Sequence, residues 1–111
     1  MAKVEQYRAY IEQLIKEYSR YQPSYGEVEV QVVCDREQDH YHLCYMGWDG
    51  HERIHGWVLH VDLKDGKIWI QHDSTESNIA TELVTLGVPK EDIVLAFHPP
   101  YLRPYTDFAT G

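Results

Sequence analysis

The stretch WIQHDSTESN, residues 69–78, holds the three residue types of a serine-hydrolase triad side by side: His72, Asp73 and Ser74. In such a triad the histidine lies between the serine and the acid, and the three residues usually converge from distant parts of the chain. The chain also lacks the GxSxG turn that exposes many catalytic serines. We therefore interpret His72 as the end of a strand, Asp73 as a helix cap and Ser74 as the first helical residue. We assign no catalytic residue.

The residues after Asp73 support this structural interpretation. Asp73 and Glu76 have the spacing of a capping box, in which two side chains satisfy free N–H groups around the first helical turn. The apolar residues that follow recur at helical spacing, and Gly87 followed by Pro89 is a typical helix end. We therefore predict a helix over residues 74–86.

Histidine is abundant, and HYHLC places His40, His42 and Cys44 on one face of a predicted strand. The register of the first predicted hairpin adds His55 opposite Cys44. Strand residues two positions apart are separated by about 7 Å, so a zinc ion would reach two of the three, together with His55 and a further ligand. No CxxC or HExxH spacing supports such a site. We expect no metal or cofactor, although the sequence leaves open whether this face binds one.

The elements that position these residues follow from hydrophobic periodicity and turn signals. Residues 4–21 predict an amphipathic helix, and residues 27–34 alternate as a strand does. The Asp-Gly pairs at 49–50 and 65–66 each separate two apolar runs and predict two-residue hairpin turns. The predicted fold class is α+β: an N-terminal helix, an antiparallel four-stranded meander, a helix and an extended C-terminal arm. We expect one domain over residues 1–111.

The two hairpin turns also predict which residues share a sheet face. The expected cross-strand pairs are Cys44 with His55, His42 with Trp57, Leu59 with His72, and Val61 with Ile70. One predicted face carries Cys44, Met46, Trp48, Trp57, Leu59, Val61, Leu63, Ile68 and Ile70. The other carries Tyr41, Leu43, Tyr45, Ile54, Val58 and Trp69. Because both faces are largely apolar and two helices cover only one face well, we expect the second face to contact another subunit or a partner.

The C-terminal segment FHPPYLRPYTDFATG is rich in proline and aromatic residues. Its prolines exclude a regular helix and favour extended structure. The segment either packs on its own domain or engages another chain through tyrosine and arginine, which are enriched at binding hot spots. Residues 93–97 form either a further strand or part of this arm. The candidate contact residues for a partner or a second subunit are Tyr41, Tyr45, Trp69, Arg103 and Tyr105.

Composition narrows the function classes. The 111 residues carry a net charge of -8, and the ten Lys and Arg residues are scattered along the chain. DNA-binding proteins usually present a basic patch, because phosphate contacts supply much of their affinity, so we expect no direct nucleic-acid binding by this chain alone. No apolar run is long enough to span a membrane, and no signal peptide is visible. We therefore expect a cytoplasmic protein whose two cysteines are free thiols.

Three segments carry a family resemblance: GKIWIQHDSTE (66–76), GVPKEDIVLAFHPP (87–100), and the tail with Arg103, Tyr105, Phe108 and Ala109. With them, nearly the whole chain resembles the XisI-like family, the fdxN element excision controlling factor proteins of cyanobacteria. The resemblance implies a small α+β domain that helps to control programmed excision of a DNA element during heterocyst development. It also implies a site-specific recombinase and an XisH-like protein, similar to nuclease-fold proteins, as participants. The family offers no established catalytic residues to transfer.

Three function hypotheses follow. The first is a non-enzymatic control factor that acts through protein contacts with an XisH-like partner or the recombinase complex, and that also self-associates into a homo-oligomer. The second is an acidic inhibitor, similar to an antitoxin, that occupies the DNA groove of a nuclease-fold protein and is suited to it by the negative net charge. The third and weakest is a metal-dependent enzyme that uses the histidine-rich face.

Overall fold

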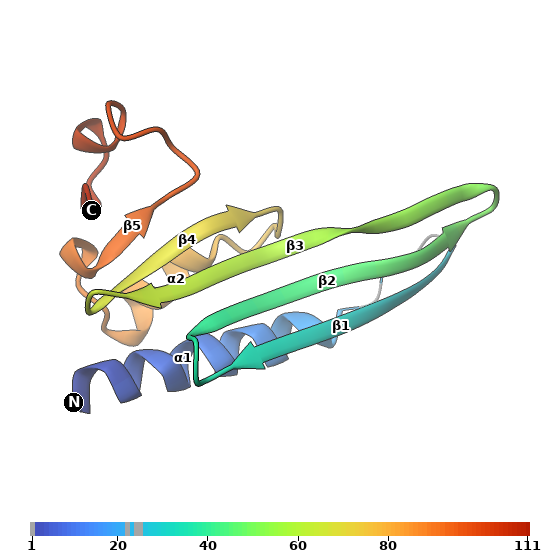
Figure 1. The fold of residues 1–111 in the computed structure, drawn as a ribbon, viewed down its shortest axis with the longest axis horizontal. Coiled ribbons are helices and arrows are strands. Elements are labelled where there is room, and N and C mark those ends of the chain that lie inside the picture. Colours follow the sequence, from blue (N-terminus) through green and yellow to red (C-terminus); the bar gives the residue numbers. More distant parts are fainter. Residues whose placement is uncertain (1, 22, 24–25) are drawn as a thin grey trace.

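A five-stranded sheet with two helices on one face makes up the computed structural model, which describes residues 2–21, 23 and 26–111 (Figure 1). The elements in chain order are α1 (Ala2–Ser19), β1 (Glu27–Asp35), β2 (His40–Asp49), β3 (Glu52–Lys64), β4 (Lys67–Asp73), α2 (Ile79–Leu86) and β5 (Ile93–Leu95), with short 3-10 helices at Lys90–Asp92 and Arg103–Tyr105. The predicted N-terminal helix and four-stranded meander are confirmed, because β1 to β4 pair antiparallel in sequence order.

The sheet has one strand more than predicted. Residues Ile93–Leu95 form β5, which pairs parallel to β4 with Ile93 beside Ile68. The connection through α2 provides the long crossover that parallel neighbours require. The sheet is therefore mixed, and the prediction of a purely antiparallel four-stranded sheet was wrong in this respect.

The two hairpin turns differ in how well the sequence predicted them. The second turn is confirmed: Lys64 pairs with Lys67, and Asp65 and Gly66 both have positive φ, as a type I′ turn requires. In the first hairpin Asp49 pairs with Glu52, so the central residues are 50–51 and not 49–50. This turn places glycine, with φ 63°, at the first central position, where a type II′ turn needs it.

Two β-bulges then change which residues lie opposite one another. Between the Leu43–Leu59 and Cys44–Trp57 pairs, β3 contains one extra residue, Val58. Between the Val61–Ile70 and His60–His72 pairs, β4 contains one extra residue, Gln71. The shifted first turn pairs Cys44 with Trp57, and the turn and the Val58 bulge together pair His42 with His60. The Gln71 bulge pairs Leu59 with Asp73, whereas the predicted pair of Val61 with Ile70 is confirmed.

The bulges redistribute the two predicted sheet faces. Residues directly opposite in an antiparallel pair share a face, so Tyr41 and Leu43 lie with Val61 and Leu59 on the helix-covered side. Tyr45, two positions along β2, lies on this side as well. The two faces predicted from the sequence are thus each a mixture of the observed ones.

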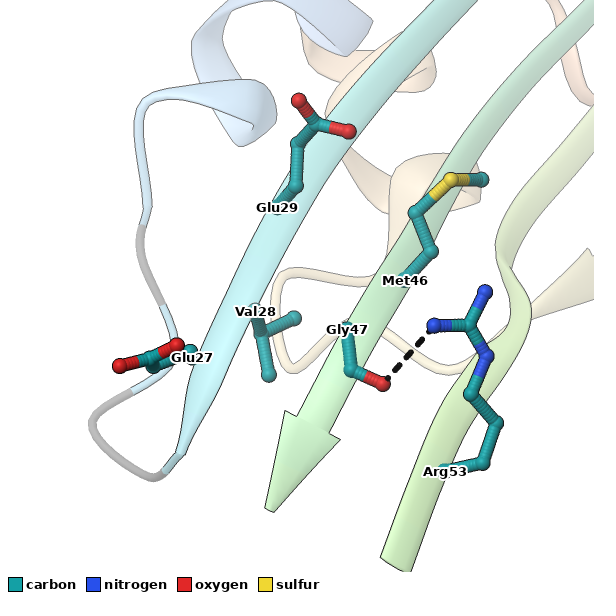
Figure 2. A pocket seen from close by; sticks show the side chains of 6 residues that line it. All are labelled: Glu27, Val28, Glu29, Met46, Gly47 and Arg53. Carbon is teal, nitrogen blue, oxygen red and sulfur yellow. Dashed lines mark hydrogen bonds between the residues drawn. The ribbon is translucent and has the colours of Figure 1, made fainter. Parts of the chain in front are cut away.

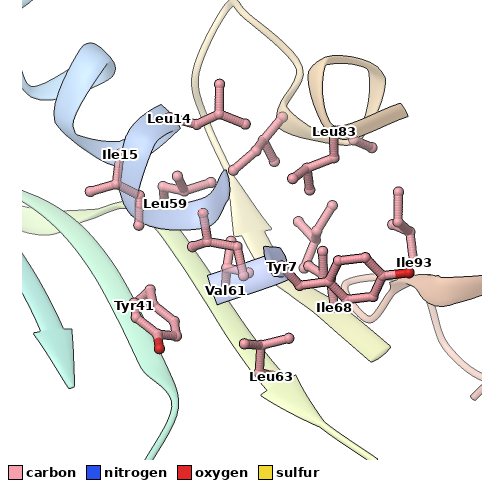
Figure 3. Close-up of a cluster of buried hydrophobic side chains, with 14 of the residues drawn as sticks. Tyr7, Leu14, Ile15, Tyr41, Leu59, Val61, Leu63, Ile68, Leu83 and Ile93 are labelled. Atoms are coloured by element: carbon pink, nitrogen blue, oxygen red, sulfur yellow. The ribbon is translucent and has the colours of Figure 1, made fainter. Parts of the chain in front are cut away.

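The core lies between the helix-covered sheet face and the two helices (Figure 3). The apolar stripe of α1 supplies Tyr7, Ile11 and Leu14, as its periodicity predicts, and Ile15 adds to it. The remaining buried residues come from β2 (Tyr41, Leu43), β3 (Leu59, Val61, Leu63), β4 (Ile68, Ile70), α2 (Ile79, Ala80, Leu83) and the segment after it (Val88, Ile93, Val94).

Helix α2 begins five residues later than predicted. Asn78 is the N-cap, with φ 53°, and its side chain accepts a hydrogen bond from the Thr81 amide at 3.3 Å. The predicted capping box is not formed, because the helix begins only after Glu76. Asp73 nevertheless accepts hydrogen bonds from the amides of Thr75 (2.8 Å) and Ile79 (3.1 Å), so its carboxylate holds the loop before the helix.

The end of α2 is as predicted. Gly87 follows the helix with φ 113°, and its amide bonds back to Leu83 and Val84. The Val88 amide also donates to the Leu83 carbonyl at 3.0 Å, which completes a Schellman motif.

The C-terminal arm packs on the chain's own sheet. The Ala109 amide donates to the Ile93 carbonyl at 2.8 Å, and Ala109 bridges to Val94 beside β5. Lys67 also donates to the Gly111 carbonyl at 2.7 Å. The arm therefore covers the β5 edge of the sheet, whereas β1 forms the opposite edge (Figure 1).

Candidate functional site

The sheet face opposite the helices is the main candidate surface, and we call it the open face. Its side chains come from Val33 of β1, His40, His42, Cys44, Met46 and Trp48 of β2, His55, Trp57, His60 and Asp62 of β3, and Trp69 of β4. Trp57 and Trp48 are 52% and 51% exposed, and Val33 is 45% exposed. Among the described residues, neither helix packs over this face, so it presents large apolar side chains to solvent.

A cluster of imidazole and indole rings occupies the middle of the open face. The His42 ring meets Trp57 edge-on with centroids 4.3 Å apart and meets His60 at 4.4 Å. Trp57 and His60 stack at 5.2 Å. The cluster forms because the Val58 bulge brings His60 opposite His42, while the register set by the β2–β3 turn already places Trp57 opposite Cys44.

The Asp62 carboxylate links His60 of this cluster to side chains on the neighbouring strands. One oxygen accepts from His40 Nδ1 at 2.8 Å and from His60 Nε2 at 3.0 Å. The other oxygen accepts from Gln71 Nε2 at 3.3 Å, which reaches it from the bulge in β4. Asp62 therefore connects side chains from three neighbouring strands.

The electrostatic environments of the histidines differ. The hydrogen bond to Asp62 raises the pKa of His40 above its usual value, and burial opposes the shift. Burial lowers the pKa of His42, and the neighbouring His60 lowers it further. The buried Nε2 of His42 has no hydrogen-bond partner within the described part of the chain.

The structure does not bring together the residue set weighed for a metal from the sequence. His55 pairs with Met46, and Cys44 pairs with Trp57. Neither His55 nor Cys44 therefore lies beside the imidazole of a second candidate ligand. The group with metal-ligand geometry is instead His40, His60 and Asp62, whose ligand atoms all lie within 4.8 Å of one another. The sequence signal for two of these residues is the HVD spacing at 60–62, which places two ligand types on one strand face.

Two of the predicted contact residues do not lie on the open face. Tyr41 is fully buried, with 0% exposure, and its hydroxyl donates to Asp39 at 2.9 Å and accepts from Arg8 at 3.2 Å. It has no accessible surface with which to contact a partner. Tyr45 is half-buried on the helix side of the sheet.

The other three predicted contact residues lie near the C-terminal arm. Trp69 is on the open face, where Lys64 and Arg103 approach its ring at 4.7 Å and 5.7 Å. Arg103 also donates to the His98 carbonyl at 3.0 Å, which anchors the arm. Tyr105 is 87% exposed on the arm itself.

The apparent triad is only partly assembled. His72 Nε2 and Ser74 Oγ lie 2.6 Å apart at the exposed end of β4. The Asp73 carboxylate, however, accepts from the Thr75 and Ile79 amides, so it holds the loop before α2 and does not orient His72. The helix cap predicted at Asp73 is instead Asn78.

Two surface depressions lie away from the ring cluster. A shallow depression lies next to the β2–β3 turn, where the Arg53 side chain donates to the Gly47 carbonyl at 3.3 Å (Figure 2). A half-enclosed pocket of about 260 Å³ lies beside the arm and is lined by Ile70, Asp73, Thr75, Asn78, Ala80, Thr81, Leu95, Phe97 and Phe108. Neither depression groups an acid, a base and a nucleophile.

Several basic side chains are paired with acids. The ion pairs are Lys3 with Asp92 (2.6 Å), Arg8 with Asp39 (3.0 Å), Arg36 with Glu12 (3.1 Å) and Lys90 with Asp107 (3.9 Å). Local pairing weakens the positive field that phosphate binding needs. Neither helix of the described residues is long and apolar enough to cross a membrane.

These features define a small α+β protein with a mixed sheet, helices on one face and an aromatic, histidine-rich second face. The family model described as XisI protein matches residues 1–110, and the chain belongs to this family, as its sequence segments suggested.

Two crystal structures show how closely the fold is shared. A XisI-like protein from Anabaena variabilis is 44% identical, with a TM-score of 0.91 over 97% of this chain and 99% of that one. The fdxN element excision controlling factor XisI from the same organism is 35% identical, with a TM-score of 0.86 over 98% and 99%. No protein with a curated description matches the chain.

Proposed function

We propose that this protein is a non-enzymatic control factor for excision of a DNA element, and that it acts through protein contacts made by the open face. The observation that carries the proposal is the exposed Trp57, Trp48 and Val33 on a sheet face that the helices do not cover. Aromatic side chains are enriched at interaction hot spots, and an exposed apolar patch of this kind is typical of a binding surface. The description of the 35% identical relative as an fdxN element excision controlling factor supports the part of the proposal that concerns excision of a DNA element.

Direct DNA binding by the chain alone fits poorly with its charge. The net charge is -8, and the ion pairs of Lys3, Arg8 and Arg36 leave those side chains locally neutralised. Control would therefore act on the proteins of the excision reaction and not on the ends of the element.

The partners in this proposal are an XisH-like protein and, through it, the site-specific recombinase complex. A second copy of the chain would also use the open face, which gives a homo-oligomer in the absence of the partner. The setting would be the cytoplasm of a cell that carries out programmed excision during heterocyst development.

The test is co-expression with an XisH-like protein, followed by size-exclusion chromatography with light scattering. We expect co-elution at a fixed ratio, and at least about tenfold weaker association for Trp57→Ser, because loss of a hot-spot aromatic costs about 2 kcal/mol or more. Tyr21→Ser is the matched control, since Tyr21 is an exposed aromatic beyond the end of α1. Separate elution of the wild-type proteins, or equal binding by Trp57→Ser, would contradict the proposal.

A second candidate function is an acidic inhibitor of a nuclease-fold protein. Glu27 and Glu29 favour it, because both are exposed on the edge strand β1 and lie on the open side of the sheet, opposite Trp48 and Met46. Binding that falls steeply with added salt would favour this candidate, whereas salt-insensitive binding would favour the apolar contact.

A further inference from the structure

We propose that His40, His60 and Asp62 form a binding site for one divalent transition-metal ion of the zinc type. The site lies on the same open face as the protein contact proposed above, but the inference does not rest on that contact. It starts from the convergence of two imidazoles and one carboxylate from two adjacent strands of the open face.

The distances suit a small ion that prefers nitrogen and oxygen ligands. His40 Nδ1 and His60 Nε2 lie 2.8 Å and 3.0 Å from the same Asp62 oxygen, and all three ligand atoms lie within 4.8 Å of one another. Two ligands of a tetrahedral zinc ion, each bonded at about 2.0–2.1 Å, are separated by about 3.3 Å. Small side-chain rotations therefore bring the three atoms around one ion. Each neutral imidazole then carries its proton on the other ring nitrogen.

The surroundings resemble those of a supported metal site. Gln71 donates to the second Asp62 oxygen at 3.3 Å, which fixes the carboxylate as outer partners of metal ligands do. His42, with its buried and unpartnered Nε2 and its ring 4.4 Å from that of His60, is the nearest candidate for a fourth ligand. The His40 side chain is about half exposed, so an ion can enter from solvent.

The shifted first turn and the Val58 bulge explain why the sequence did not predict this site. The observed register places His40 opposite Asp62 and His42 opposite His60. Both pairs lie on adjacent hydrogen-bonded strands, which hold ligands more firmly than loops do.

The first test is calorimetric titration of the untagged, EDTA-treated and dialysed protein with ZnCl₂. We expect one Zn²⁺ per chain, and at least about tenfold weaker binding for His60→Ala and for Asp62→Asn. His55→Ala is the matched control, because His55 is an exposed histidine on the same strand outside the cluster. The titrations are run on variants that keep the wild-type circular dichroism. No saturable binding, or unchanged binding by both cluster variants, would overturn the proposal.

A second readout locates the ion within the molecule. Trp57 lies 4.3 Å from the His42 ring and 5.2 Å from the His60 ring, so bound Ni²⁺ should quench its fluorescence. The quenching should disappear in Trp57→Phe while the calorimetric affinity for Zn²⁺ stays within about twofold of the wild type, a margin below 0.5 kcal/mol. Quenching that persists fully in Trp57→Phe would place the ion near another tryptophan and contradict the site.

Discussion

Tyr41 offers a sharp test of the bulge-determined register, because the sequence suggested a surface contact and the structure places it in the core (Figure 3). Its ring is fully buried, and its hydroxyl lies between Asp39 (2.9 Å) and Arg8 (3.2 Å). Truncating a buried aromatic side chain to alanine typically costs 3–5 kcal/mol, so we expect Tyr41→Ala to lose about 4 kcal/mol of unfolding free energy. Tyr41→Phe removes only the hydroxyl, with its two hydrogen bonds to charged groups, and should lose about 1.5–3 kcal/mol.

Both losses are measurable by urea unfolding, and each 1 kcal/mol should lower Tm by about 4 °C for a domain near this size. The control is Tyr105→Phe, which alters an exposed hydroxyl and should stay within about 0.5 kcal/mol of the wild type. If Tyr41→Ala unfolded like the wild type but lost partner binding, Tyr41 would be a surface contact and the assigned register would be wrong.

The Asp39 carboxylate adds a second readout of the same contact. Burial acts to raise its pKa, but the hydrogen bonds from Arg8 and Tyr41 outweigh burial and leave the pKa below its usual range. Loss of the Tyr41 hydroxyl in Tyr41→Phe should therefore move this pKa upward, as measured by NMR titration of the carboxyl carbon. An unchanged pKa would mean that the hydroxyl does not contact Asp39 in solution.

Three further predictions concern the backbone at Gly47, the helix cap Asn78 and the buried acid Asp92. Gly47→Ala should destabilise the fold by about 2 kcal/mol or more in urea unfolding, because a Cβ there would lie 2.0 Å from the Glu27 carbonyl oxygen, whereas Gly56→Ala has open space and should be tolerated. Equal stability of the two variants would contradict the close approach of β1 and β2. Asn78→Ala should cost about 1–2 kcal/mol, from the lost cap and from alanine at φ 53°, and Asn78→Gly clearly less; the reverse order in thermal melts would refute this capping role. Burial acts to raise the pKa of Asp92, but hydrogen bonds from Lys3 and Tyr7 of α1 outweigh burial and leave this pKa below its usual value. The ionised Asp92 carboxylate should therefore stabilise the wild type fully above about pH 4, and this contribution should be lost as the pH falls through the lowered pKa. In Asp92→Asn, stability measured by acid unfolding should depend less on pH in this range.

Local signals predicted most elements of this fold. The Asp65-Gly66 turn and the Gly87 helix end depend on the backbone preferences of residues close in sequence. The apolar stripe of α1 and the alternation of β1 reflect burial of one face, and each leaves a periodic pattern within one short segment. All four signals are therefore readable from the sequence alone.

The bulges were not predictable, because the apolar pattern fits both sheet faces. A one-residue shift usually moves apolar side chains into water and is thereby excluded, but here both faces of β2 and β3 are rich in aromatic and aliphatic residues. The register past Val58 and Gln71 is decided by packing against α1 and α2, which are distant in sequence. For a related reason the sequence left residues 93–97 open between a further strand and part of the arm, since only three residues pair with β4.

The sequence predicted the part of the candidate site that lies on one strand, but not the part that depends on the pairing of β2 with β3. HYHLC correctly places His40 and His42 on one face, and both lie on the open face. His60 and Asp62 were missed as their neighbours, because the shifted first turn and the Val58 bulge together move β3 by three positions relative to the predicted pairing with β2. The ring cluster is thus a product of tertiary packing and not of a sequence motif.

Hydroxyl-radical footprinting tests the central claim most directly, because it reports which exposed side chains become buried when a partner binds. The complex with a co-purified XisH-like protein is compared with the free chain at low concentration. We predict that Trp57 oxidation falls severalfold in the complex while Tyr105, on the arm, remains as reactive as in the free chain. Equal oxidation of Trp57 in both samples, in a complex shown to be intact by light scattering, would contradict a role for the open face in protein binding.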